Sequence, residues 1–99
     1  MARTTRGLIL SALDELLDAD FRRFKNHLND ATIIPGFGPI PRGRLENADR
    51  VETANIVYNH FSERNSLNAT FETLNAINQR NLADRLSNEI PANYRADLR

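Results

Sequence analysis

Residues 33–41 read IIPGFGPIP, and this stretch divides the chain into two helical parts. It holds three prolines and two glycines, which do not continue a helix because proline lacks an amide proton and its ring clashes with the preceding turn. A flexible linker would be more polar, yet this stretch carries large apolar residues: Ile33, Ile34, Phe37 and Ile40. We therefore expect a long ordered loop that packs on the helices around it, with Phe37 against the bundle.

Two amphipathic helices are expected before this loop. Residues 5–17 place their apolar side chains within one arc of about 120°, and Thr4 or Thr5 is a suitable N-cap. The residues of this arc are Ile9, Leu10, Leu13, Leu16 and Leu17. Asp18 is expected to cap the second helix, whose apolar stripe consists of Phe21, Phe24 and Leu28.

Four further helices are expected after the loop, the first of them short, at about residues 41–46. The next starts at Asp49, which has the spacing of a capping box with Glu52, and runs to about Phe61. Its expected inner face holds Val51, Ala54, Val57, Tyr58 and Phe61. The last two cover about residues 65–77 and 79–89, with Asn78 as the cap of the final helix. No strand pattern competes, so the sequence predicts an all-α antiparallel bundle of five solid helices and one short one.

The composition limits the kinds of function. Ninety-nine residues favour one domain, residues 1–90, followed by residues 91–99 as the start of a linker or tail. The 13 basic and 13 acidic residues leave no net charge, which argues against bulk attraction to nucleic acid or to a membrane. The chain has no cysteine, no membrane-length apolar run and no signal-peptide pattern. Since it also lacks a catalytic, metal or cofactor motif, we expect a cytoplasmic domain that is not an enzyme and binds no cofactor.

Four stretches together resemble the pyrin domain of inflammasome sensors and adaptors. They are LDELL at residues 13–17, FRRFK at 21–25, GFGPIPRGRL at 36–45 and NLADRL at 81–86. The specific part is FK one turn before a leucine, followed by the long loop with its G-aromatic-G-x-I-P-R-G-x-L pattern. The resemblance covers about residues 5–90 and implies a six-helix death fold with a long loop before a short third helix. It also implies a module of innate-immune signalling that binds other pyrin domains and polymerises into helical filaments.

The same resemblance implies two charged surfaces that meet between neighbouring molecules. Carried over by position, the acidic surface consists of Asp14, Asp49 and Glu52, and the basic surface of Arg22, Lys25 and Arg42. Arg23 and Arg44 lie beside these basic residues and are expected to extend their surface. Ile56 falls on the expected outward face of its helix, where it is a candidate apolar anchor. Unlike charges on different sides of a molecule favour head-to-tail association, which gives open helical polymers when it does not close.

Several alternatives stay open from the sequence. A single exposed charge is often only solvated, Asp49 can act as an N-cap alone, and a lone exposed isoleucine often has no role. The parent protein can be a sensor, an adaptor, a caspase with a pyrin prodomain, or a decoy that caps assemblies. The arginines at 22, 23, 42 and 44 would also suit nucleic-acid phosphates, although acidic residues are as numerous. The glycosylation sequon at residues 68–70 falls in an expected helix and is interpreted as incidental.

Overall fold

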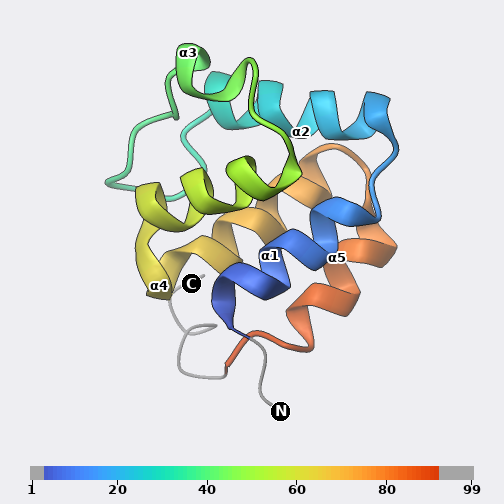
Figure 1. Cartoon of the computed structure of the whole chain (residues 1–99). Coiled ribbons are helices and arrows are strands. Elements are labelled where there is room, and N and C mark those ends of the chain that lie inside the picture. The colour runs from blue at the N-terminus through green and yellow to red at the C-terminus, as the bar shows by residue number, and fades with distance from the viewer. Residues whose placement is uncertain (1–3, 92–99) are drawn as a thin grey trace.

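The protein is described by a computed structural model that covers residues 4–91, a range that contains helices and no strands. The elements are α1 (Thr5–Asp14), α2 (Asp18–Asp30), α3 (Arg42–Leu45), α4 (Arg50–Ala76) and α5 (Arg80–Ser87). α4 contacts each of the other four helices and occupies the middle of the bundle (Figure 1). The predicted all-α bundle with a long loop before a short third helix is confirmed. The predicted tail lies outside the described residues from position 92 onward.

α4 is broken at Ser62, where the backbone angles are φ 74° and ψ 170°. The chain turns sharply beside the α4 label, so that residues 50–61 and 63–76 run in different directions (Figure 1). With these two halves counted separately, the five elements of residues 4–91 become the six predicted helices. Glu63 follows the break directly and accepts hydrogen bonds from the hydroxyls of Thr5 and Tyr58, the second at 2.9 Å.

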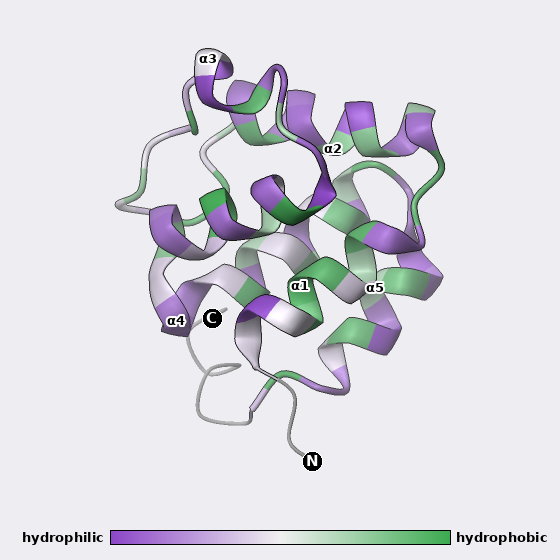
Figure 2. Cartoon of the chain, viewed as in Figure 1, coloured by the Kyte–Doolittle hydropathy of each residue, from purple (hydrophilic) through white to green (hydrophobic). Residues whose placement is uncertain are grey.

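The core follows α4 through the bundle. Five consecutive residues of its second half, 66–70, are buried, which places this half between the other helices. Its buried hydroxyls are partly satisfied within the helix, since Thr70 donates to the carbonyl of Ser66 at 2.9 Å and Thr73 to that of Ala69 at 2.7 Å. Figure 2 shows the hydrophilic colour concentrated on α2 and around α3, so these elements form a polar outer side.

The loop of residues 31–41 packs on the bundle, as predicted. Its Pro35–Gly36 pair forms a turn in which Phe37 N–H donates to the Ile34 carbonyl at 3.0 Å, and Gly36 adopts the positive φ of 91° that a type II turn requires at this position. The Phe37 ring lies 5.8 Å from the ring of Phe61, centroid to centroid. Ile40 is fully buried.

The loop is also held by polar contacts from both sides. The Ile40 N–H donates to the Leu28 carbonyl at 3.0 Å, and the Asn29 amide donates to the Ile40 carbonyl at 3.1 Å. On the other side, His60 Nε2 lies 2.7 Å from the Gly38 carbonyl oxygen. α3, which follows the loop directly, is therefore held against α2 and α4.

The corner between α1 and α2 differs from the prediction. α1 is capped by Thr4, whose hydroxyl accepts from Gly7 N–H at 2.9 Å, but it ends at Asp14 and not at Leu17. Leu17 is consequently not part of the inner face and is 75% exposed. The prediction that Asp18 caps α2 is also wrong, because Asp18 is the first residue of α2 and Leu17 occupies the cap position without a side-chain hydrogen bond.

The inner face of the first half of α4 is rotated relative to the predicted one. Ile56, predicted to face outward, is only 8% exposed and belongs to the core, whereas Val51, predicted to be inside, is 55% exposed. The reason is the loop: His60 lies one turn after Ile56 on the same side of the helix and contacts Gly38, so this side faces the loop and not solvent. Ile56 is therefore not an exposed apolar anchor.

Asn78 ends α4 and does not cap α5. Its φ of 67° is left-handed, its N–H donates to the Asn75 carbonyl at 3.1 Å, and the next N–H, of Gln79, donates to the Leu74 carbonyl at 2.8 Å. This pair of bonds is a Schellman motif, in which asparagine replaces the more usual glycine. The cap position of α5 is taken by Gln79, which makes no capping hydrogen bond with its side chain.

We predict that Ser62→Gly stabilises the domain by about 1 kcal/mol. The backbone angles of Ser62 lie in a region that is nearly restricted to glycine, so the substitution removes about 1–3 kcal/mol of strain against about 0.5–1 kcal/mol of lost chain entropy. The midpoint of thermal unfolding should rise by about 4–8 °C. Ser11→Gly in the regular helix α1 is the matched control and should lower that midpoint. A thermal midpoint of Ser62→Gly below that of wild type would contradict the proposed backbone strain at Ser62.

Candidate functional site

The three residues of the predicted acidic surface are all exposed. Asp14 is the last residue of α1, Asp49 precedes α4, and Glu52 lies in the first turn of α4. Within residues 4–91 none of the three forms an ion pair. Asp49 is also the N-cap of α4, because its Oδ1 accepts from the Glu52 N–H at 2.8 Å. The capping role predicted for Asp49 is thus confirmed, and it leaves the carboxylate at the surface.

The residues of the predicted basic surface divide into two groups. Arg22, Arg42 and Arg44 are exposed and have no ion-pair partner among the described residues. Arg23 is exposed as well, but it pairs with Asp20 of the same helix at 3.3 Å. Lys25 is half-buried and is already engaged in the fold.

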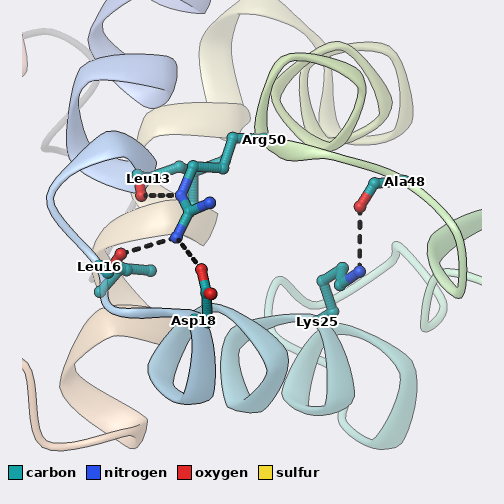
Figure 3. Close-up of polar contacts among 6 residues, drawn as sticks. All are labelled: Leu13, Leu16, Asp18, Lys25, Ala48 and Arg50. Carbon is teal, nitrogen blue, oxygen red and sulfur yellow. Dashed lines mark hydrogen bonds and ion pairs between the residues drawn. The ribbon is translucent and has the colours of Figure 1, made fainter.

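Lys25 links α2 to the segment that leads into α4. Its ammonium group donates to the carbonyl of Ala48 at 3.0 Å (Figure 3) and lies 4.8 Å from the centre of the Phe21 ring. The Lys25 side chain is therefore less free to turn toward a partner molecule, because such a movement would break its hydrogen bond to the segment before α4.

An open groove of about 530 Å³ lies between α2, α3 and the start of α4, and we call it the α2–α3 groove. Phe21 and Leu45, which are almost fully buried, contribute apolar surface to it. Arg22, Lys25 and Arg42 line it, and so does Asp49. The groove therefore brings together three of the predicted basic residues, and it places one predicted acidic residue at their edge.

Asp14, Glu52, Arg23 and Arg44 do not line this groove. Asp49 is therefore the predicted acidic residue that lies nearest the basic ones, since it lines the groove with them and accepts from the Glu52 N–H. Ile56, the remaining predicted site residue, is inside the core.

Arg50 is the residue of this region that sequence reasoning missed. Its Nε donates to the Leu13 carbonyl at 2.9 Å, and its Nη2 donates to the Leu16 carbonyl at 2.7 Å and to Asp18 Oδ1 at 3.2 Å (Figure 3). The guanidinium carbon also lies 4.7 Å from the centre of the Phe21 ring. These contacts join the start of α4 to the end of α1 and the start of α2.

No sequence pattern points to Arg50. Its partners are backbone carbonyls 34 and 37 positions away, and any residue type provides such a carbonyl. A positive charge at the carboxyl end of α1 is electrostatically favourable, but this preference does not select one arginine among the others.

The geometry can be compared with known proteins. Residues 8–84 match the family model described as PAAD/DAPIN/Pyrin domain. The chain belongs to the pyrin domain family. The pyrin domain is a protein-interaction module of the death fold and not a catalytic fold, so the predictions of family, fold and absence of enzymatic function are confirmed.

Solved and curated relatives agree with this assignment. The solution structure of the pyrin domain of human Pyrin superposes with a TM-score of 0.76 at 33% identity, covering 86% of this chain and 94% of that one. Mouse Pyrin is 36% identical over 86 residues, which are 87% of this chain and 11% of the relative. Human NACHT, LRR and PYD domains-containing protein 10 is 32% identical over 94 residues, 95% of this chain and 14% of the relative. The chain thus spans about a tenth of the length of these curated relatives.

Two further sequence features have a definite place in this pyrin domain. The sequon at residues 68–70 is buried inside α4, where the folded domain offers no access for glycosylation. Within residues 4–91 no helix has the length and apolarity to cross a bilayer, and His, Asp and Glu do not gather into a group that could hold a metal ion.

We predict that Arg50→Gln destabilises the domain by about 1–3 kcal/mol, because it leaves the half-buried Leu16 carbonyl without its donor and removes a cation from the Phe21 ring. The Leu13 carbonyl loses one donor but still accepts from the Leu16 N–H at 3.1 Å. Arg50→Lys should lose less, since an ammonium group reaches one of the carbonyls but not both. Denaturant unfolding measures both variants. Arg80→Gln, on the exposed side of α5, is the matched control and should leave stability within about 0.5 kcal/mol of wild type. An equal, small effect of Arg50→Gln and Arg80→Gln would contradict the role of Arg50.

Proposed function

We propose that this pyrin domain binds other pyrin domains, its own copies included, and thereby assembles an innate-immune (inflammasome) signalling complex. The observation that carries the proposal is the exposure of two unlike sets of charges on one small domain of the pyrin family. Asp14 and Glu52 are acidic and exposed, and Arg22 and Arg42 are basic and exposed, all four without ion-pair partners within residues 4–91. Such charges are available to a neighbouring molecule.

The contact we propose is head-to-tail. The acidic surface, Asp14, Asp49 and Glu52, meets the basic surface of the next copy, which consists of Arg22, Lys25 and Arg42 with Arg23 and Arg44 beside them. The two surfaces are different, so each copy keeps one of them free after it has bound one neighbour. Repetition of this contact without closure gives a helical filament. Zero net charge supports such growth, because added copies do not build up repulsion.

The domain in this proposal is residues 1–90, with residues 91–99 as the start of a linker or tail, and its parent protein acts in the cytoplasm. Its relatives among the NACHT, LRR and PYD domains-containing proteins favour a sensor as that protein. A decoy that caps assemblies uses the same surfaces, and the two cases differ in whether the domain extends a filament or ends it.

We predict that Asp14→Arg and Arg42→Glu each raise the concentration needed for assembly at least about tenfold, because a reversed charge faces a like charge across the interface. Sedimentation and negative-stain electron microscopy of the domain, alone and with the pyrin domain of human Pyrin, measure this. An equimolar mixture of the two variants should assemble again as an alternating polymer, since each reversed surface then meets a reversed partner. Arg80→Glu, on the exposed side of α5, is the control and should assemble as wild type does. Unchanged assembly of both reversed variants would refute the proposed contact.

We also predict that assembly weakens with added salt. Raising the ionic strength from about 0.1 M to about 1 M shortens the screening length from about 10 Å to about 3 Å, which removes most of the attraction between exposed charges. Light scattering as a function of salt should show a higher threshold concentration at each step. A threshold that is independent of salt in the wild-type domain would contradict the electrostatic contact.

A further inference from the structure

Two large apolar side chains are exposed among residues 4–91, Leu17 at 75% and Val51 at 55%. Leu17 belongs to the corner between α1 and α2, and Val51 lies in the first turn of α4. Single exposed apolar residues are common on protein surfaces and need no explanation. These two residues are 34 positions apart in the sequence. If they lie close together in the fold, they indicate a binding surface better than the exposure of either residue alone.

Arg50 brings the two residues to the same place. Its guanidinium donates to the carbonyl of Leu16 and to the carboxylate of Asp18, the two neighbours of Leu17 in the chain. Val51 is the residue directly after Arg50. Leu17 and Val51 are therefore each one position away in the chain from residues that this contact joins, and we call them the apolar pair.

Acidic residues lie close to both members of the apolar pair in the chain. Asp14 and Asp18 stand three positions before and one after Leu17, and Glu52 follows Val51; all three are exposed. The Asp18 carboxylate is 93% exposed although it contacts Arg50, so its charge also faces solvent. An apolar centre with an acidic rim fits a partner that has an apolar hollow with a basic rim.

We propose that the apolar pair is the apolar centre of the homotypic contact and is seated in the α2–α3 groove of a second copy of this chain. The inference rests on the proposed head-to-tail function and adds the residues that give the contact its apolar part, a role that the sequence assigned to Ile56. The groove offers apolar surface from Phe21 and Leu45 and two exposed cations, Arg22 and Arg42. Three carboxylates line it as well: Asp18 contacts Arg50, Asp49 caps α4, and Glu46 is exposed.

The occupant is a second copy because the apolar pair does not fill the groove of its own chain. Asp18, Asp49 and Arg50 line that groove and are direct chain neighbours of Leu17 and Val51, yet both apolar side chains remain mostly exposed. Lys25 and Arg50 donate to backbone carbonyls within the fold, so Arg22 and Arg42 are the groove cations left to pair with the acidic rim of the incoming copy.

The first experiment replaces the apolar pair by serine. Leu17→Ser and Val51→Ser should each raise the threshold concentration for assembly about five- to tenfold, the loss expected when a partly buried aliphatic contact is removed. Their thermal midpoints should stay at the wild-type value, because both side chains are exposed in the single domain. Ala76→Ser, an exposed change at the far end of α4, is the matched control and should leave the threshold unchanged.

The dependence of assembly on salt distinguishes the apolar contact from the charged contact. In about 1 M salt the charges are screened and the apolar contact is not, so wild type should retain residual assembly that Leu17→Ser and Val51→Ser lose. If both serine variants assemble as wild type does at every salt concentration, while Asp14→Arg and Arg42→Glu do not assemble, the inference fails and the proposed function stands. If wild type does not assemble under any of these conditions, both fail.

The second experiment locates the apolar pair directly. The chain has no cysteine, so single introduced cysteines give unambiguous disulfides between copies. Asn26 is exposed and lines the groove, and a mixture of Val51→Cys and Asn26→Cys chains under mild oxidation should give mostly the mixed dimer. In the control mixture Ala76→Cys replaces Asn26→Cys, and the mixed disulfide dimer should form only in small amount. A predominance of Val51→Cys homodimers, or equal yields with both partners, would overturn the proposed seat.

Discussion

The anchoring of Arg50 is the constraint on which the rest of the surface depends. One guanidinium satisfies the carbonyls of Leu13 and Leu16 and contacts Asp18, so the end of α1, the start of α2 and the start of α4 are held at one point. The Leu13 carbonyl also accepts from the Leu16 N–H at 3.1 Å, whereas Arg50 is the donor to the Leu16 carbonyl, and a half-buried carbonyl without a donor costs about 1–3 kcal/mol. The position of this corner therefore follows from a few strong local contacts.

The corner also decides which residues reach the surface. Because α1 stops at Asp14 and the chain bends through the anchored segment, Leu17 is turned outward, where a continued helix would have buried it. The same anchoring leaves Val51 at the surface at the start of α4. The acidic residues Asp14 and Glu52 are presented beside them, so the chemistry of this side of the molecule is a consequence of the way three chain segments meet.

The elements that depend on local interactions could be predicted from the sequence. The loop followed from its prolines and glycines, and the start of α4 from the spacing of Asp49 and Glu52. The break at Ser62 lies in the gap between the helix expected to end near Phe61 and the one expected to begin near residue 65. Which face of the first half of α4 is buried could not be predicted. The side that carries Ile56 is covered by the loop of residues 31–41, which precedes this helix in the chain. The sequence identified charged candidates, but it could not show that Lys25 and Arg50 hold the fold together. Both donate to backbone carbonyls of residues that are distant in the sequence.

The α2–α3 loop has a further consequence for binding. A helix of four residues such as α3 has little stability of its own, yet here the contacts of Ile40, Asn29 and His60 fix the chain that leads into it. Arg42 thus meets a partner on a backbone that folding has already ordered, and association need not order it again. Encounter between two such domains then resembles the docking of rigid bodies, whose rate is set by orientation and long-range charge attraction and not by folding upon binding.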